Sequence, residues 1–397
     1  MKTTAVRMYG KDDLRFEEFE LPDIKEDEIL AHIISDSICM SSYKAAKQGS
    51  EHKRVPENIA DEPVMIGHEF CGQIVKVGSK WSGKYNEGEK FTIQPALNYK
   101  GTLDAPGYSY RWVGGAATDI VIPNEVMEMD CLLPYDQEAY YYGSLSEPMS
   151  CIVGAFRASY HVPQGTYEHQ MGLRPNGTMA ILAGAGPMGL GAVDLALHGD
   201  VKPRKLVVTD IDAIRLTRAE ELFPIAEAKK EGVELVYINT AKLDDPIASL
   251  KAESGTEGFD DVFVMAPVAP VVEQADRILA KDGCMNFFAG PTNTEFSAMV
   301  NFYDIHYEFH HIVGTSGGNT EDMKISLEMM KERRIDPSMM ITHVGGLNSV
   351  PETTLTLPKI PGGKKLIYTN VNLPLTAIED FAEKGKSDPF WAKLADI

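Results

Sequence analysis

The sequence predicts an α/β protein in which a doubly wound parallel sheet is joined to a β-rich domain. Three observations support this fold class. A glycine-rich turn lies between a strand-like run and a helical pattern, strands and helices alternate after residue 150, and short strand-like runs fill the first 150 residues. With 397 residues, of which 44% are hydrophobic, the chain is long enough for two domains with separate cores.

The glycine-rich turn has the spacing of a dinucleotide-binding motif. Gly184, Gly186 and Gly189 follow the apolar run 178–183 and lead into a helical pattern at 190–198. Gly184 permits the tight turn, Gly186 lets the backbone approach a pyrophosphate, and Gly189 lets the helix pack closely on the strand. A glycine-rich turn can also serve tight packing alone. Because strand and helix flank this one, the pattern favours a nucleotide site.

The residues around this turn strengthen the prediction of a nucleotide site. Pro187 and Met188 lie in the turn before the helical pattern, whose N-terminal N–H groups would face an anion. Asp210 follows 21 residues after Gly189, at the end of the apolar run 205–209. Its carboxylate can accept hydrogen bonds from an adenosine ribose and would repel a 2′-phosphate. The sequence therefore predicts NAD(H) in preference to NADP(H).

Composition excludes several classes of partner. The chain has 38 basic and 58 acidic residues, a formal net charge of −20, and its positive charges are scattered, so nucleic acid is not an expected partner. No apolar run approaches the roughly 20 residues needed to cross a bilayer, and the start has no secretory pattern. We therefore expect a cytoplasmic protein without a membrane partner. Five dispersed cysteines without paired spacing do not predict a disulfide framework.

Turn signals and apolar runs define the expected domains. We expect the β-rich domain at residues 1–150 and 318–397, and the doubly wound domain at 151–317. The expected strands of the β-rich part are 28–35, 72–77, 91–94, 117–122 and 364–370. Those of the doubly wound part are 178–183, 205–210, 234–239, 260–265, 284–289 and 310–315. Two further helices are expected at 320–334 and 378–397, the second with Phe381, Phe390, Trp391 and Leu394 on its apolar side.

Four residues before position 150 are of the types that bind a catalytic zinc ion. They are Cys39, the adjacent His68 and Glu69, and Glu147. Each has a structural alternative, because Cys39 suits a core thiol, His68 a turn, and the two acids a surface or a helix cap. Spacing alone leaves both interpretations open.

Five motifs, taken in order, resemble those of the medium-chain dehydrogenase/reductase family, the zinc alcohol and polyol dehydrogenases. They are Gly67–Gly72, Val77-Gly78, Gly88–Phe91, Ser146–Pro148 and Val208–Asp212 with Arg215. The resemblance spans nearly the whole chain. It implies a Rossmann nucleotide-binding domain, with Arg215 near the adenosine end, and a GroES-like catalytic domain.

The resemblance also implies one catalytic zinc ion. Cys39, His68 and Glu147 would hold it, with Glu69 close enough to exchange in, and Ser41 would relay a proton. Zinc would act as a Lewis acid on a carbonyl, while the nicotinamide supplies the hydride. Between Cys71 and Cys131 no cysteine is available for the family's second, structural zinc.

The segment after Cys39 departs from the family pattern. It reads Met40-Ser41-Ser42-Tyr43-Lys44, where the family usually has Gly, Ser or Thr, Asp, any residue and His. Lys44 would replace the distal histidine of the proton relay or contact the substrate, and both alternatives stay open.

Longer stretches resemble a group within this family that reduces L-sorbose 1-phosphate. These stretches are 1–5, 66–72, 123–128, 130–133 and 171–175. The resemblance implies reversible reduction of L-sorbose 1-phosphate to D-glucitol 6-phosphate by NAD(P)H. Arg111, Lys44 and Lys100 are unranked candidates for the phosphate.

Three alternatives to this reaction remain. Another polyol or polyol phosphate, such as glucitol or galactitol 1-phosphate, would need the same residues. A zinc-free quinone reductase would lack Cys39 and Glu147 in their motifs, and a non-catalytic NAD-binding regulatory protein would be expected to lose the metal ligands. The family also implies a homo-oligomer, a dimer or tetramer, that pairs through a sheet edge, here expected at 284–289.

Overall fold

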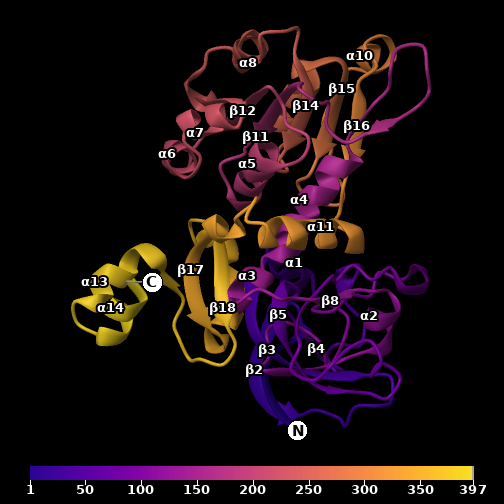
Figure 1. Cartoon of the computed structure of the whole chain (residues 1–397), viewed down its shortest axis with the longest axis vertical. Coiled ribbons are helices and arrows are strands. Elements are labelled where there is room, and N and C mark those ends of the chain that lie inside the picture. Colours follow the sequence, from indigo (N-terminus) through magenta and orange to yellow (C-terminus); the bar gives the residue numbers. More distant parts are fainter. Residues whose placement is uncertain (396–397) are drawn as a thin grey trace. The chain divides into compact units, whose positions relative to one another are not determined.

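The structure, a computed structural model, describes residues 1–395 and divides into two compact units (Figure 1). The first contains residues 1–147 and the chain from residue 341 onward, and the second contains Pro148–Met340. The expected boundary at 318 therefore differs from the division by contacts, which lies at 341. Residues 318–340 pack with the second unit because Asp322 pairs with Arg157 and the backbone N–H of Asp336 donates to Asp194 over 2.7 Å.

The first unit is built on two sheets. Three strands form the smaller sheet in the order β2 (Asp13–Glu20), β1 (Lys2–Gly10) and β4 (Val64–Met65). The larger sheet has the order β19-β17-β18-β3-β5-β6-β8, and β7 also pairs with β3. Its strands are β3 (Ile29–Ile38), β5 (Phe70–Val77), β6 (Lys90–Ile93), β7 (Asp119–Ile122), β8 (Leu132–Pro134), β17 (Ile341–Gly346), β18 (Lys364–Tyr368) and β19 (Thr376–Ala377).

Strand β3 is the centre of the larger sheet. It pairs with β5 and β7 and, near its end, with β18, all antiparallel. Ile29, Ala31 and Ile33 alternate along it and are fully buried, which is the period of a strand with one face in a core. The strands expected before residue 150 and at 364–370 are therefore found, while the hairpin of β1 and β2 was not expected.

Short helices connect the strands of the first unit. The α-helices are α1 (Met40–Gln48), α2 (Asn124–Glu128), α3 (Tyr140–Gly143), α12 (Val350–Thr356), α13 (Phe381–Gly385) and α14 (Pro389–Ala395). The 3₁₀ turns are η1 (Gly49–Glu51), η2 (Tyr99–Gly101), η5 (Leu347–Ser349), η6 (Leu357–Lys359) and η7 (Ile378–Asp380).

The single C-terminal helix expected at 378–397 was wrong. The tail forms η7 and two short helices, α13 and α14, because a proline at residue 389 disfavours helical backbone at the residue before it. Phe381 and Trp391 are buried against each other, with ring centroids 5.1 Å apart, whereas Phe390 is exposed. Residues 396 and 397 lie outside the described part of the chain.

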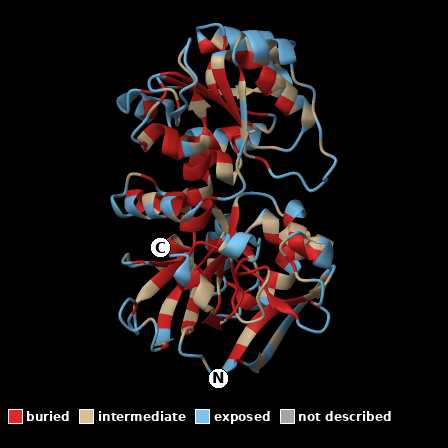
Figure 2. Cartoon of the chain, turned by 90° about the vertical axis from the view of Figure 1, so that its right-hand side faces the viewer, coloured by how far each residue is buried: buried red, intermediate tan, exposed pale blue. Residues whose placement is uncertain are grey.

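The second unit has a six-stranded parallel sheet, as its alternating pattern predicts. The order is β13-β12-β11-β14-β15-β16, which is the order of a doubly wound nucleotide-binding sheet. The strands are β11 (Thr178–Leu182), β12 (Lys205–Asp210), β13 (Glu234–Asn239), β14 (Phe259–Val264), β15 (Leu279–Phe287) and β16 (His311–Gly314). Figure 2 shows the central strands buried along their length, because helices cover both faces.

Helices and short pairs complete the second unit. They are α4 (Ser146–Ala158), whose first two residues belong to the first unit, α5 (Pro187–His198), α6 (Ala213–Leu222), α7 (Ile225–Lys230), α8 (Pro246–Ser254), α9 (Ala269–Ile278), α10 (Phe302–Tyr307) and α11 (Thr320–Lys331). The remaining elements are β9 (Tyr160–His161), β10 (Gln170–Met171), η3 (Thr240–Lys242) and η4 (Pro337–Met340). No helix within residues 1–395 is both long and apolar enough to span a bilayer.

The expected edge strand of the parallel sheet was wrong. Residues 284–287 belong to β15, which lies between β14 and β16, and β16 forms the edge. The sequence could not show this, because a buried apolar run looks the same whether it has one neighbouring strand or two.

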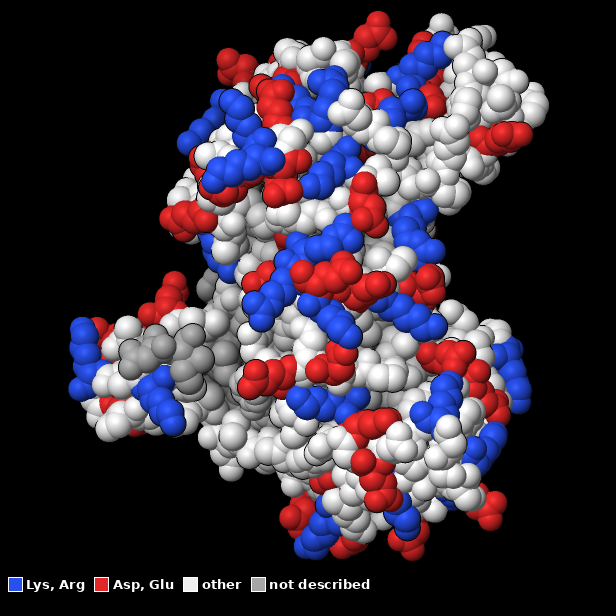
Figure 3. Space-filling view, viewed as in Figure 1, with Lys and Arg blue, Asp and Glu red and all other residues white. Residues whose placement is uncertain are grey.

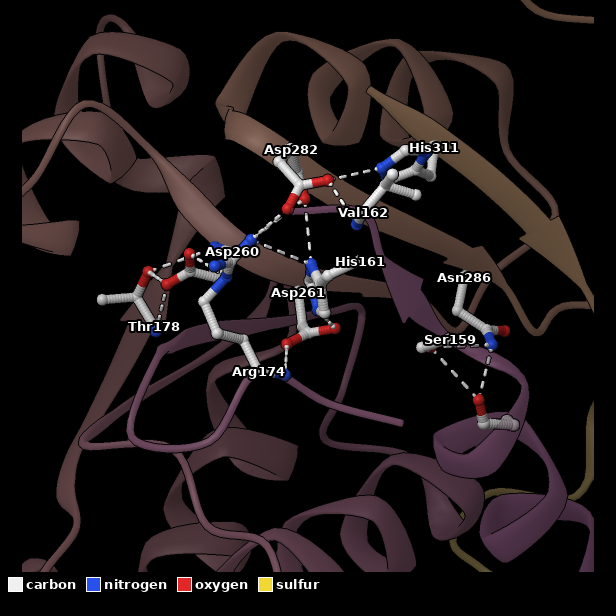
Figure 4. A network of polar contacts seen from close by, with 11 residues as sticks. Ser159, His161, Val162, Arg174, Thr178, Asp260, Asp261, Asp282, Asn286 and His311 are labelled. Atoms are coloured by element: carbon white, nitrogen blue, oxygen red, sulfur yellow. Dashed lines mark hydrogen bonds and ion pairs between the residues drawn. The ribbon is translucent and has the colours of Figure 1, made fainter. Parts of the chain in front are cut away.

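A polar network fastens the β9–β10 segment to β14 and β15 (Figure 4). The ring of His161 contacts Asp261 Oδ1 at 3.2 Å and the carbonyl of Asp282 at 2.9 Å. The Asp282 carboxylate pairs with Arg174 at 2.5 Å and His311 at 2.7 Å. Burial acts to raise the pKa of Asp282, but His311, a backbone N–H and Arg174 outweigh it, so the pKa is lowered. This network explains how an irregular segment is held on the sheet.

We predict that Asp282→Asn lowers the free energy of unfolding by about 2 kcal/mol at pH 7, because the ion pair with Arg174 loses its charge and the hydrogen bond with His311 loses a charged acceptor. Asp282 has a φ of +59°, which asparagine also tolerates, so the backbone is kept. A carboxyl whose folded pKa is lowered contributes stability that is lost as pH falls through that pKa. Urea unfolding should therefore show the difference between the two proteins shrinking below about pH 4. Asp200→Asn, at an exposed ion pair with Arg334, is the control, and equal losses in both variants would contradict the prediction.

Candidate active site

Strand pairing in the first unit brings distant residues to one end of β3. Cys39 follows the last residue of β3 and is the N-cap of α1. Because β5 runs antiparallel to β3 and pairs Phe70 with Asp36, the residues before β5 lie beside this end. The start of β18 reaches the same place, because Lys365 pairs with Ile38. The metal candidates His68 and Glu69 thus meet Cys39 through the sheet register.

Cys39, His68 and Glu69 form a compact group of possible metal ligands. One ligand atom from each residue lies within 4.8 Å of the other two. Cys39 Sγ is 2.9 Å from Ser41 Oγ, and His68 Nδ1 is 3.3 Å from Ser42 Oγ. His68 and Glu69 are almost fully buried. The structure therefore brings together three of the four candidates expected from the sequence.

Glu69 is held by a buried ion pair. Lys364 Nζ contacts both carboxylate oxygens, with 2.6 Å to Oε2, and Ser37 Oγ donates to Oε2. Burial acts to raise the pKa of Glu69, but Lys364 and then His68 outweigh it and the pKa is lowered. The pKa of Lys364 is raised in spite of burial, because Glu69 lies against it. Both groups are therefore charged at neutral pH, in a place where neither would be charged alone.

Glu147 lies at the start of α4 and is also buried, but its carboxylate lies outside the group within 4.8 Å. Burial raises the pKa of Glu147 to about 7, partly offset by His68 and increased by Glu69 and Cys39. Burial lowers the pKa of His68, while Glu147 and then Glu69 act to raise it. Glu147 is therefore near enough to interact electrostatically with His68 and Cys39.

The donor set fits a zinc ion. A sulfur, an imidazole nitrogen and a carboxylate oxygen are ligands that zinc prefers, and a buried site is where such an ion contributes most. Burial, followed by the charge of Glu69, raises the pKa of the Cys39 thiol. A divalent cation bound here would lower the pKa of the Cys39 thiol and of the acids, because it stabilises the thiolate and the carboxylates.

Several residues of this site gave no signal in the sequence. Lys364 lies 295 positions after Glu69, and Ser37 is an ordinary strand residue. The buried Tyr108 places its hydroxyl 3.2 Å from His68 Nε2. Asp36 Oδ1 accepts from the backbone N–H of Glu69 at 3.3 Å, and burial raises the pKa of Asp36 well above its usual value. Only the fold shows that these residues surround the metal candidates.

Gly67 is required before His68 by the backbone and by space. Its φ is +91°, and a Cβ there would lie 2.3 Å from a carboxylate oxygen of Asp36. Glycine is the residue that adopts this conformation without strain. Gly67 therefore lets the chain turn so that His68 and Glu69 enter the site.

In the second unit, the glycine turn has the geometry of a nucleotide site. The backbone N–H of Gly184 donates to Thr209 over 2.7 Å, which joins the turn to β12. A Cβ on Gly189 would lie 2.1 Å from the Gly184 carbonyl, so α5 packs too closely for any larger residue. A Cβ on Gly186 would meet nothing within 4 Å, so this glycine faces open space where a ligand could approach. Pro187 and Met188 are the first two residues of α5.

Asp210 ends β12 with its carboxylate held by the backbone. It accepts from the N–H groups of Ile211 at 2.8 Å, Asp212 at 3.0 Å and Ala185 at 3.3 Å. Arg215, on α6, has its Nε 3.7 Å from Asp212. The structure thus places the acid beside the glycine turn, with the arginine on the helix that follows.

Comparison with known proteins gives the same picture. Residues 25–130 match the alcohol dehydrogenase GroES-like domain, and residues 187–332 match the zinc-binding dehydrogenase domain. Mannitol-1-phosphate 5-dehydrogenase of Aliivibrio fischeri is 53% identical over 100% of this chain and 93% of its own length. L-sorbose 1-phosphate reductase of Klebsiella pneumoniae is 49% identical over 96% of this chain and 92% of its own.

The chain belongs to the zinc-binding alcohol dehydrogenase family. It is an oxidoreductase of the zinc-dependent alcohol and polyol dehydrogenase type, and its cofactors are zinc and a nicotinamide dinucleotide. The crystal structure of 2R,3R-butanediol dehydrogenase from Bacillus subtilis has the same fold. It is 22% identical, with a TM-score of 0.75 over 93% of this chain and all of that one. The expected Rossmann and GroES-like architecture is confirmed.

We predict that Lys364→Met lowers the free energy of unfolding of this dehydrogenase, without metal, by about 3–5 kcal/mol, because Glu69 would be left buried without its counter-charge and would have to take up a proton to stay there. The double variant Glu69→Gln/Lys364→Met should lose much less, since neither charge remains. Urea unfolding of the wild type, both single variants and the double variant measures the coupling. Lys386→Met, at an exposed ion pair with Glu383, is the control. Equal losses in the Lys364 single variant and the double variant would show that the ion pair is not the source.

Proposed function

We propose that this dehydrogenase reduces L-sorbose 1-phosphate to D-glucitol 6-phosphate with NADH, and catalyses the reverse reaction. The observation that carries the proposal is the buried Cys39–His68–Glu69 group in a chain 49% identical to an L-sorbose 1-phosphate reductase. A second candidate is the oxidation of mannitol 1-phosphate at C5, which the 53% identity to a mannitol-1-phosphate 5-dehydrogenase favours. Both reactions interconvert a secondary alcohol and a ketone on a sugar phosphate.

In this proposal Cys39, His68 and Glu147 would hold the zinc ion. Glu69, which is paired with Lys364, would be close enough to serve as an alternative carboxylate ligand. The two acids differ in their counter-charges, because Lys364 contacts Glu69 directly whereas burial raises the pKa of Glu147. When bound, zinc supplies Lewis-acid stabilisation of negative charge on the substrate oxygen.

Ser41 is the residue that carries the proton in this proposal. Its hydroxyl lies 2.9 Å from Cys39 Sγ, so it sits at the edge of the metal group, where a substrate oxygen would bind. A hydroxyl can donate and accept at once, which a relay requires. The buried phenol of Tyr108 lies 3.2 Å from His68 Nε2 and also interacts with the Ser41 hydroxyl.

The cofactor site in this proposal is the glycine turn of the second unit. Gly184, Gly186 and Gly189 would receive the pyrophosphate with the N-terminus of α5, where Pro187 and Met188 lie. Asp210 would accept the adenosine ribose hydroxyls, and Arg215 would lie near the adenine. The carboxylate repels a 2′-phosphate, which supports NAD(H) over NADP(H).

A homo-oligomer and a cytoplasmic location stay predictions. The edge strand β16 and the segment before it, which includes α10, expose large apolar side chains. The exposed residues are Phe302, Tyr303, Tyr307, Phe309 and Ile312. Their exposure supports pairing of two copies at that edge. Light scattering of the purified protein would measure how many chains associate.

We predict about one zinc ion per chain by elemental analysis and oxidation of NADH with L-sorbose 1-phosphate. Cys39→Ala and His68→Ala should each lose zinc and lower kcat/KM at least about 1000-fold, because the electrophile is lost. NADH binding, measured by its fluorescence, should be nearly unchanged, since the nucleotide residues lie in the other unit.

The same assay separates the candidate functions. Turnover of mannitol 1-phosphate with NAD, and none of L-sorbose 1-phosphate, would favour the second candidate. Turnover of free L-sorbose at the same efficiency would remove the phosphate from the proposal. Absence of zinc together with absence of turnover on all substrates would favour a non-catalytic NAD-binding protein, and loss of NADH binding in both variants would contradict the assigned division of roles.

We predict that Asp210→Ala raises the dissociation constant of NADH by roughly 10-fold to 100-fold, because the ribose loses a charged acceptor. The constant for NADPH should fall or stay the same, since the repulsion of its 2′-phosphate is removed. Fluorescence titration with both nucleotides measures the two constants. Asp245→Ala is the control, because Asp245 is an aspartate of the same unit that caps α8 through the N–H group of Ala248. An unchanged preference in the Asp210 variant would remove this residue from the site.

A further inference from the structure

Basic side chains of the first unit gather around Tyr108, the residue whose hydroxyl touches His68. The ring of His52 stacks on Tyr108 with centroids 5.7 Å apart and planes 8° apart. The guanidinium carbon of Arg54 lies 5.9 Å from the same ring. Lys44 projects from α1, half-buried, on the helix that begins at Cys39. His52 and Arg54 thus contact Tyr108, which contacts the metal candidate His68, and Lys44 lies on the helix that follows the metal candidate Cys39.

The electrostatics of His52 show that these positive charges act on one place. Its pKa is lowered to about 4, first by burial and then by the charges of Arg54, Lys53, Lys44 and His68. Burial lowers the pKa of Lys44, and the nearby Cys39 thiol partly offsets this. Several positive charges therefore act on His52, in a chain with a formal net charge of −20.

Arg54 has no carboxylate partner among the residues that the structure describes. No Asp or Glu oxygen lies within 4.0 Å of its side chain, and its Nη1 donates to the Leu103 carbonyl at 3.0 Å. By contrast, Lys47 pairs with Asp12 at 2.7 Å, and Arg111 pairs with Glu62 at 2.9 Å. On the face drawn in Figure 3, acidic and basic side chains are interspersed in the same way. An arginine without a carboxylate partner binds an anion with less competition.

The backbone holds this segment in place. Gly49 has a φ of +58°, and a Cβ there would lie 2.7 Å from the backbone nitrogen of Lys11, so the turn after α1 packs tightly on the chain after β1. Ser109 Oγ donates to the carbonyl of Arg54 at 2.6 Å. The backbone N–H of Arg54 donates to His52 Nδ1 at 3.3 Å. Since Nδ1 accepts, the neutral ring carries its proton on Nε2, which is a donor.

We propose that Lys44, His52 and Arg54 form the subsite for the phosphomonoester of the substrate. The inference rests on the proposed function, because it assigns the phosphate of the same sugar. An arginine fork and an ammonium are the groups that bind a phosphate dianion, and the His52 Nε2–H adds a neutral donor. Of the other basic candidates, Arg111 is neutralised by Glu62, and Lys100 lies on the ring of Tyr99.

In this proposal Lys44 binds the substrate phosphate, whereas the histidine at the corresponding position in the family relays a proton. In a proton relay, loss of Lys44 would lower kcat. In a phosphate subsite, loss of Lys44 raises KM for the sugar phosphate and weakens phosphate binding, while kcat changes little. The two roles are therefore separable by kinetics.

The test uses zinc-loaded full-length protein with Arg54→Gln and Lys44→Gln. Their controls are Arg111→Gln and Lys47→Gln, which remove a residue of the same type at the ion pairs with Glu62 and Asp12. The KM for L-sorbose 1-phosphate should rise roughly 10-fold to 100-fold in each subsite variant and stay within about twofold in the controls. Inorganic phosphate should inhibit the wild type competitively, and the subsite variants about tenfold more weakly.

Direct binding separates failure of the subsite from failure of the proposed function. Calorimetry with D-glucitol 6-phosphate and with D-glucitol measures the contribution of the phosphate without turnover. If no substrate is turned over, but Arg54→Gln and Lys44→Gln still lose affinity for D-glucitol 6-phosphate, the subsite stands and the proposed reaction fails. Equal affinity in all five proteins, or a loss confined to kcat, overturns the subsite.

A second readout follows His52 itself. Its ring resonances in the wild type should shift when inorganic phosphate is added, because the anion approaches Nε2–H, and the shift should vanish in Arg54→Gln. Ring resonances that do not respond to saturating phosphate or D-glucitol 6-phosphate would also overturn the proposal.

Discussion

The buried ion pair between Glu69 and Lys364 is the interaction on which the geometry of the candidate active site depends. It joins a residue before β5 to the first residue of β18, and both strands flank the end of β3, where Cys39 begins α1. A buried carboxylate needs a compensating charge, and a buried ammonium needs one equally. The pair therefore fixes the C-terminal part of the chain against the metal group, and keeps Glu69 ionised where it can serve a metal ion.

The metal group shows how one sheet register supports chemistry. Cys39, His68 and Glu69 come from two connections, yet the antiparallel pairing of β3 with β5 brings their donor atoms within 4.8 Å. A shift of one residue in that pairing would turn the side chains to opposite faces. Gly67 and Asp36 also restrict this register, because any side chain at position 67 would collide with the buried Asp36 carboxylate. The surrounding serines and Tyr108 orient the sulfur and the imidazole before any metal binds.

Tyr108 contacts both the metal group and the proposed phosphate subsite. Its hydroxyl contacts His68, while its ring stacks on His52 and lies beside Arg54. A substrate held by its phosphate on one side of this residue would have its reacting carbon on the other, which is how binding far from the reaction centre positions a substrate. In the second unit, the glycine turn supplies the corresponding anion site for the cofactor through backbone groups, with no lysine or arginine required.

The sequence by itself determined the class of fold and the glycine turn with Asp210, because these depend on local patterns, whereas the metal candidates stood out only through the family resemblance. Periodicity revealed five of the six parallel strands within a residue or two of their ends, and β15, which begins at residue 279, only in its second half. The tertiary structure decided what depends on pairing over long distances. It showed that β16 is the edge strand, that residues 318–340 pack with the nucleotide unit, and that the tail breaks into two helices. Lys364, Ser37, His52 and Arg54 carried no motif, because a residue's neighbours in the fold follow from pairing over long distances and leave no local pattern in the chain.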